Sequence, residues 1–216
     1  MHAAIAGHAG RQKGALHMTP MELGDYWDRG YIIDKPKKNV YSFERYEGTE
    51  PDVVIPDCVS IIRKNAFAKN QYLQSVVIPE GITEIPDKAF YGCTALRRVA
   101  LPSTLKVIGD SAFTGCRLLE SITFPQGLGY IGCDAFCGCG FRKLVIPDSV
   151  GTISAGAFRC CASLTDVSLP ADVKIARSYR EEIVYQHPMS GGPYPVEIPH
   201  NGAFLDTPFG RAHGME

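Results

Sequence analysis

Residues 76–98 read VVIPEGITEIPDKAFYGCTALRR, and residues 99–121 read VALPSTLKVIGDSAFTGCRLLES. Both stretches place an apolar residue before proline, an Ala-Phe pair, a Gly-Cys pair and a closing leucine at the same positions. Agreement at four separate places over 23 residues indicates an internal repeat. A repeat of this length is one structural unit that cannot bury its apolar face alone, so the pattern predicts stacked coils that share a core.

The repeat extends well beyond these two units. The first residue of the apolar-proline pair recurs in steps of 23, 23, 23, 22 and 23 residues, at Ile55, Ile78, Leu101, Phe124, Ile146 and Leu169. The phenylalanine of the Ala-Phe pair keeps these steps, at Phe67, Phe90, Phe113, Phe136 and Phe158. Because the two series stay in phase, we expect each to form a column along the stack, with the phenylalanines buried at one corner.

A third series identifies the strand of each coil. Apolar residues follow the spacing L-x-x-L-x-L, as in Leu73, Val76 and Ile78, which is the spacing of leucine-rich repeats. The last two apolar positions alternate as in a short strand with one buried face. Proline follows directly, and since it has no N–H to donate, it ends the strand at the same level in every coil.

The combined pattern V-x-I-P-x-x-V-x-x-I-x-x-x-A-F-x-x-C-x-x-L resembles the BspA-like leucine-rich repeat family, found in many bacterial and some protist proteins. The resemblance covers Asp52 to Pro170. It implies a right-handed, β-rich solenoid with a parallel concave sheet and with short turns, 3-10 or helical corners on the convex side. It also implies a protein-binding role, because the family includes surface proteins that adhere to host or neighbouring-cell proteins.

The segments outside the repeats predict capping structures. We divide the chain into a lead (1–18), an N-terminal helix and capping hairpin (19–51), the solenoid (52–170) and an irregular C-terminal cap or tail (171–216). Thr19-Pro20 is typical of a helix start, and a turn at 48–51 predicts a hairpin between the segments on either side of it. Ala203-Phe204 lies 46 residues after the preceding Ala-Phe pair, twice 23, which is compatible with a closing coil.

Composition excludes several classes of function. The formal net charge is −1 and no stretch approaches the ~20 apolar residues of a membrane-spanning helix, so we expect no nucleic-acid binding and no membrane insertion. Residues 1–17 do not resemble an export signal, which favours the cytoplasm for the chain as given. Cell-surface or secreted placement is the alternative if a signal has been removed.

Eight cysteines raise three alternatives: structural thiols, disulfides or a metal site. Cys93, Cys116, Cys139 and Cys161 each lie three residues after a repeat phenylalanine. The common position favours a ladder of buried thiols with one member in each coil. Cys58, Cys133, Cys137 and Cys160 lie off this ladder.

Catalytic motifs are missing from the sequence. It has no Gly-rich phosphate loop, no H-E-x-x-H and no G-x-S-x-G, and its six histidines all lie outside the repeats. We therefore expect no catalytic residue, no cofactor and no metal. An enzyme or metal protein with its site in 171–216 is a second alternative.

The concave face remains as the candidate site. Residues between the buried apolar positions point outward from it, so polar side chains of successive coils lie side by side. The expected partner is another protein, with acidic loops or acidic glycans as the favoured chemistry, and an adhesin-type module is the first alternative. The expected contact residues are Arg97, Arg98, Ser121, Thr123, Arg142, Lys143 and Asp166.

Overall fold

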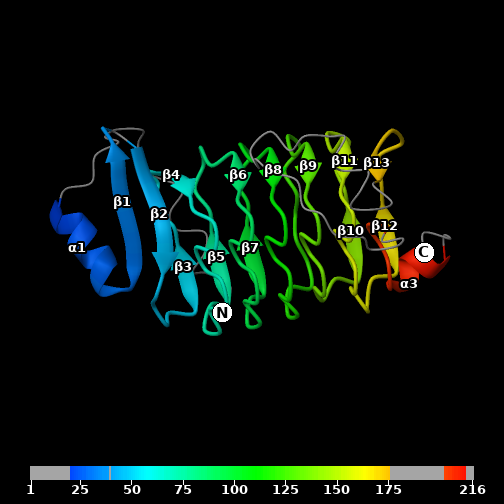
Figure 1. Ribbon diagram of the computed structural model, residues 1–216, viewed down its shortest axis with the longest axis horizontal. Helices are drawn as coiled ribbons and strands as arrows, with labels where there is room; N and C mark the ends of the chain where they lie inside the picture. Colours follow the sequence, from blue (N-terminus) through cyan, green and yellow to red (C-terminus); the bar gives the residue numbers. More distant parts are fainter. Residues whose placement is uncertain (1–19, 39, 176–201, 213–216) are drawn as a thin grey trace, which may run out of the picture.

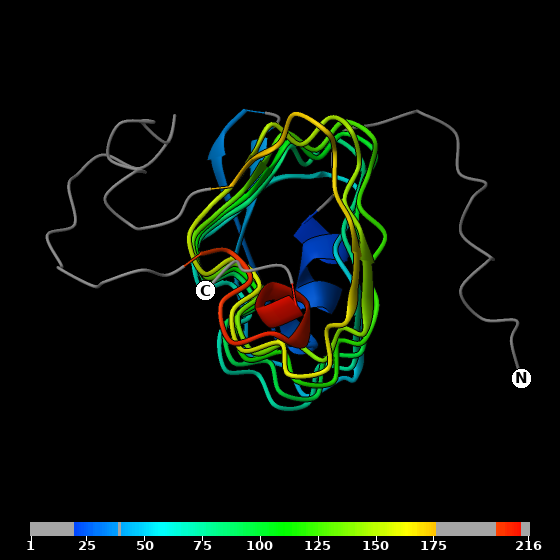
Figure 2. The same ribbon diagram turned by 90° about the vertical axis from the view of Figure 1, so that its right-hand side faces the viewer.

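The computed structural model describes residues 20–38, 40–175 and 202–212, and its ribbon is an elongated stack of coils (Figure 1). Viewed along the stack, successive coils superimpose around a common interior (Figure 2). This arrangement is the leucine-rich repeat solenoid that the 23-residue spacing predicts. Among the described residues, no helix is long and apolar enough to cross a membrane.

The N-terminal end is closed by α1 (Pro20–Asp28), β1 (Tyr31–Lys37) and β2 (Val40–Tyr46). The hairpin pairs β1 with β2 in antiparallel register, and β2 then pairs in parallel with β4 (Val59–Ile62) of the first coil. The predicted hairpin around residues 48–51 is therefore wrong. Residues 52–54 instead join a parallel sheet of the solenoid.

Short parallel strands cover two sides of the stack. We name the first the broken sheet, made of β3 (Asp52–Val54), β5 (Ser75–Val77) and β7 (Arg98–Ala100), then residues 121–123, then β10 (Lys143–Val145) and β12 (Asp166–Ser168). We name the second the continuous sheet, made of β6 (Glu84–Ile85), β8 (Val107–Ile108), β9 (Tyr130–Ile131), β11 (Thr152–Ile153) and β13 (Lys174–Ile175).

The continuous sheet goes beyond the sequence prediction, which placed turns or helical corners on that side. Its five strands are two residues long and pair without interruption from β6 to β13. They form because each coil packs an isoleucine against the core there, as at Ile85 and Ile108, and the flanking backbone becomes extended and hydrogen-bonds the next coil. The Ala-Phe corners are turns, as expected.

The Ala-Phe corners build the core. The five repeat phenylalanines are buried with ring centroids 4.9 to 5.4 Å apart and nearly parallel planes. Phe43 of β2 extends this phenylalanine stack at one end, at 4.9 Å from Phe67. Phe204 extends it at the other end, at 5.2 Å from Phe158. The stack therefore runs from the N-terminal cap through every coil to the C-terminal segment.

Left-handed backbone makes each corner sharp. The residue before alanine has φ between 51° and 68° at Asn65, Lys88, Ser111, Asp134 and Gly156. The turn directs the next backbone groups toward the neighbouring coil, so that the phenylalanine N–H donates to the alanine carbonyl one coil later, as from Phe113 to Ala135 at 2.7 Å. The corners thus pair through their main chains as well as their rings.

The ladder cysteines lie directly behind the phenylalanine stack. Each is buried and donates from Sγ to the phenylalanine carbonyl of the preceding coil, at 3.0 Å for Cys93 and 3.3 Å for Cys116. Burial raises the pKa of Cys93 and Cys161 to about 12, and that of Cys116 and Cys139 well above the usual range. All eight cysteines are free thiols.

The solenoid continues past residue 170. Strand β13 extends the continuous sheet, and the Phe158 N–H donates to the Ala203 carbonyl at 2.7 Å. Thr207 occupies the place of the ladder cysteine and donates to the Phe204 carbonyl at 2.6 Å. Helix α3 (Pro208–Ala212) then packs Phe209 edge-on against Phe204, with 5.3 Å between ring centroids, and covers this end of the core.

Candidate partner-binding face

One row of side chains runs along the outside of the broken sheet. Strand pairing aligns Asp52 with Ser75 and Arg98, and Lys143 with Asp166. Ser121 occupies the same repeat position in the coil between these two groups. The row therefore carries opposite charges near each end and a small hydroxyl residue in the middle.

The cations of this row are neutralised within the chain. Arg98 lies 4.0 Å from an Asp52 carboxylate oxygen, and Asp52 also accepts a hydrogen bond from Ser75. Lys143 lies 2.9 Å from an Asp166 carboxylate oxygen. All four charged side chains are more than half exposed, so each pair contributes only ~0–1 kcal/mol to stability. Sequence reasoning missed both ion pairs.

Two further arginines lie just before these strands. Arg97 precedes β7 and Arg142 precedes β10, and both are exposed. Neither forms an ion pair with any described residue. They occupy the same repeat position two coils apart, about two strand spacings (~10 Å), with Glu120 between them. Arg97 and Arg142 are thus the cations of this face whose charge the described chain leaves unpaired.

The broken sheet is interrupted between β7 and β10 (Figure 1). No backbone hydrogen bond joins residues 121–123 to another described coil, although Ser121 and Thr123 are exposed like their neighbours. The step that follows, from Phe124 to Ile146, is the one of 22 residues, because the next coil has one residue fewer between Cys139 and Phe141. Gly140 there donates to the Leu119 carbonyl at 3.1 Å, which replaces the usual strand pairing.

Apolar side chains lie beside the charged row. Val54 and Val145 are 54% and 58% exposed, and Ala100 is exposed between them. They occupy the last outward position of strands β3, β10 and β7. The face therefore offers charged, hydroxyl and small apolar groups in parallel rows.

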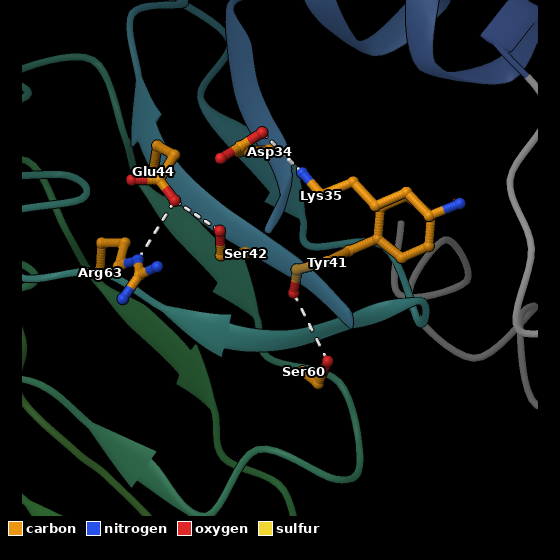
Figure 3. Close-up of polar contacts among 7 residues, drawn as sticks. All are labelled: Asp34, Lys35, Tyr41, Ser42, Glu44, Ser60 and Arg63. Carbon is orange, nitrogen blue, oxygen red and sulfur yellow. Dashed lines mark hydrogen bonds and ion pairs between the residues drawn. The ribbon is translucent and has the colours of Figure 1, made fainter. Parts of the chain in front are cut away.

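The side chains of a second polar cluster, at the N-terminal cap, contact one another (Figure 3). Glu44 accepts hydrogen bonds from Ser42 and, at 3.1 Å, from Nε of Arg63. Lys35 Nζ lies 5.1 Å from the centroid of the Tyr41 ring. These contacts tie β2 to the segment after β4, so we interpret the cluster as part of the cap.

The rival sites in the C-terminal segment lie largely outside the described residues. Positions 176–201 are not among the described residues, and neither is any of the six histidines of the chain. In the parts of the chain that the structure describes, no three His, Cys, Asp or Glu side chains are grouped so that they could hold a metal ion. Cys133, Cys137 and Cys139, close in sequence, are free thiols at different places in their coil.

Comparison with known proteins agrees with this architecture. The BspA type leucine rich repeat region matches residues 39–165 in six copies. A search of the curated proteins finds no match. Repeat modules of this family generally bind other proteins and are generally not catalysts.

Solved structures of bacterial leucine-rich repeat proteins are similar to this chain. The T. pallidum leucine rich repeat protein is 37% identical with a TM-score of 0.64, over 67% of this chain and 71% of that one. A leucine-rich repeat protein from Bacteroides ovatus is 30% identical with a TM-score of 0.61, over 67% of this chain and 41% of that one. The pneumococcal vaccine antigen PcpA, 21% identical over 68% of this chain and 49% of that one with a TM-score of 0.55, shares the fold. With more than half of its length matched by the repeat and its coils built as described, this chain belongs to the BspA-type leucine-rich repeat family.

Proposed function

We propose that this protein binds another protein through the broken sheet, and that Arg97 and Arg142 contact carboxylates of an acidic segment of that partner. The observation that carries the proposal is the pair of exposed arginines, unpaired among the described residues, on either side of an interrupted strand. An arginine can meet a carboxylate with two parallel hydrogen bonds, which makes it the best suited cation for this contact.

The remaining contact residues have supporting roles. Ser121 and Thr123 offer hydroxyl groups between the two arginines, and the unpaired backbone of residues 121–123 adds donors and acceptors that the adjoining coils leave to solvent. Arg98, Lys143 and Asp166 form the flanking ion pairs, which a partner must displace or leave intact. A rigid stack loses little backbone entropy on binding, so such contacts retain most of their free energy.

The apolar row narrows the kind of segment that fits. Val54, Ala100 and Val145 offer small apolar contacts that lie apart from one another, and none of the three side chains is as large as an aromatic ring. We therefore expect an extended segment in which acidic and aliphatic side chains alternate, because successive side chains of such a segment reach two parallel rows. This chemistry is the same for a partner inside the cell and for one outside it.

Site-specific photo-crosslinking in the organism that makes the protein tests the proposal. A crosslinking residue at Thr123 should capture a protein, whereas one at Lys106, exposed just before β8 of the continuous sheet, should not. Equal capture from both positions would contradict the proposed face. Loss of the captured species after glycosidase treatment alone would assign a glycan and overturn the protein partner.

Charge reversal then tests the two arginines. Arg97→Glu with Arg142→Glu should weaken binding of the captured partner at least ~100-fold, the loss expected for two desolvated arginine contacts. Lys88→Glu with Lys106→Glu changes the net charge equally on exposed residues elsewhere and should leave binding within about twofold. Undiminished binding by the arginine variant would contradict the assignment.

A further inference from the structure

Two cysteines outside the buried ladder lie side by side at the corners of adjacent coils. Cys137 follows Phe136 directly and is half-buried, while Cys160 lies two residues after Phe158 and is exposed. Ladder cysteines are buried in the core, but the Cys160 side chain is exposed. Packing therefore does not account for a thiol at this position.

The main chain fixes how close the two residues are. The Gly138 N–H donates to the Arg159 carbonyl at 2.8 Å. This bond joins the peptide that follows Cys137 to the peptide that precedes Cys160. One coil spacing of ~4.8 Å and an advance of about one residue (~3.3 Å) give a Cα separation of ~6 Å. Disulfides form at Cα separations of about 4.4–6.8 Å, so the separation of these two residues lies within the range of a disulfide.

The surroundings distinguish the two thiols. Burial raises the pKa of Cys137 to about 11, while a hydrogen bond from Arg159 acts in the opposite direction. Arg159 Nε lies 3.5 Å from an Asp134 carboxylate oxygen, so the guanidinium is held next to the Cys137 sulfur. Cys160 is one of the nearby groups that act on Cys137. An oxidant in solution meets Cys160 first, because only that thiol is exposed.

We propose that Cys160 and Cys137 form a thiol oxidation site that a hydroperoxide converts to a disulfide. The Cys160 thiol attacks hydrogen peroxide, the O–O bond breaks, and Cys160 becomes a sulfenic acid with release of water. The Cys137 sulfur then attacks the Cys160 sulfur, the S–O bond breaks, and a second water leaves. The two thiols lose two electrons to the peroxide, and a thiol reductant restores them by exchange.

The bridge is compatible with the folded core. It joins two corners on their outer side, and the ladder thiols of the same coils stay hydrogen-bonded to carbonyl groups, Cys139 to Phe113 at 3.3 Å and Cys161 to Phe136 at 3.2 Å. Cys161 is buried and directed inward, so it is not the partner of its neighbour Cys160. The proposal is independent of the partner-binding face.

Peptide mapping of the full-length protein after treatment with hydrogen peroxide tests this site. The expected product has lost two free thiols, contains one Cys137–Cys160 link and returns to eight free thiols with dithiothreitol. Trypsin cleaves after Arg142 and Arg159, so the two residues lie in separate peptides and fragmentation assigns the link. A link from Cys160 to any other cysteine, or further oxidation of Cys160 while Cys137 stays free, would overturn the proposal.

Single substitutions separate the two roles. In Cys137→Ser the Cys160 sulfenic acid should persist and react with dimedone, whereas in Cys160→Ser Cys137 should stay reduced at the same peroxide dose. Cys133→Ser, which removes a half-buried thiol at another position of the coil, should give the wild-type link. Each variant is first compared with the wild type by thermal unfolding. Oxidation of Cys137 at the wild-type rate in Cys160→Ser would contradict the order of the steps.

Discussion

The rings of Phe113 and Phe136 are parallel, with an interplanar angle of 0° and centroids 5.1 Å apart. The two residues are 23 positions apart in sequence, and both side chains are fully buried. Because every coil places its phenylalanine at this corner, each ring packs against the rings of the coils before and after it. The ring contacts thus contribute packing free energy in every coil of the stack.

Removing one ring from the middle of the stack should destabilise the protein strongly. Phe113→Ala leaves a cavity between two neighbouring rings, and truncation of a buried phenylalanine costs ~3–5 kcal/mol. Urea denaturation of the variant and the wild type measures the difference. Leu118→Ala, at a half-buried position of the same coil, is the control and should cost much less. A loss below ~1 kcal/mol for Phe113→Ala would contradict the role of the stack.

The ladder thiols predict that stability falls at alkaline pH. Unfolded thiols ionise near pH 8.5, whereas burial raises the pKa of Cys93 and Cys161 to about 12. Above pH 8.5 the unfolded chain releases protons that the folded chain keeps. This stabilisation is therefore complete below pH 8.5 and is lost as the pH rises toward 12.

A substitution isolates that effect. Cys116→Ser retains a donor toward the Phe90 carbonyl but has no group that ionises in this range. Its unfolding free energy should fall less steeply than that of the wild type above pH 8.5, by up to ~1.4 kcal/mol per pH unit, the value for one proton. Denaturation at a series of pH values measures the two slopes, and parallel curves would be evidence against a buried, protonated thiol.

The fold follows from spacing because the same residue type in every coil meets its own copy in the next. The 23-residue steps are therefore enough to predict the stack, the thiol ladder and the strands of the coils, except at residues 121–123, where the predicted strand does not form. The N-terminal hairpin was harder to predict, since β1 contains Pro36 and two lysines, residues that central strands avoid. As an edge strand with exposed residues 34–37, β1 tolerates them.

The candidate face was predictable only in part. All seven predicted contact residues are exposed, as the alternation of inward and outward positions requires. The pairing of Arg98 with Asp52 and of Lys143 with Asp166 depends on side-chain conformation, which spacing does not specify. The missing residue before Phe141 was visible as the 22-residue step, but its effect on strand pairing depends on the path of the backbone.

The N-terminal cap should keep the first coil from associating with other molecules. Phe43 and Tyr46 cover Phe67, and a two-point ion pair between Arg29 and Glu50, at 2.9 and 2.7 Å, holds the cap closed. Deletion of residues 1–50 should expose this apolar end and produce dimers or larger species in light scattering. Trp27→Ala, at a side chain already 52% exposed, should leave the oligomeric state unchanged. A monomeric deletion variant would show that the hairpin is dispensable.

Gly140 should be intolerant of a side chain. A Cβ at this position would lie 2.5 Å from the Arg117 carbonyl oxygen, a main-chain atom that cannot rotate away. Gly140→Ala should therefore cost ~1–3 kcal/mol, as overpacking usually does. Gly151→Ala, where the nearest atom would be 4.0 Å away, is the matched control and should be close to neutral. Equal melting temperatures for the two variants would contradict the tight approach.

Restoring the missing residue should repair the broken sheet. Inserting one serine between Gly140 and Phe141 gives this coil the 23-residue length of its neighbours and moves Gly140 away from Arg117. By analogy with the bonds from Arg98 to Gln74 and from Ile78 to Ala100, the Ser121 amide should then donate to the Arg97 carbonyl and the Leu101 amide to the Thr123 carbonyl. Hydrogen–deuterium exchange should show both amides protected in the insertion variant and unprotected in the wild type. If the two proteins exchange alike while both remain folded, coil length is not the cause of the interruption.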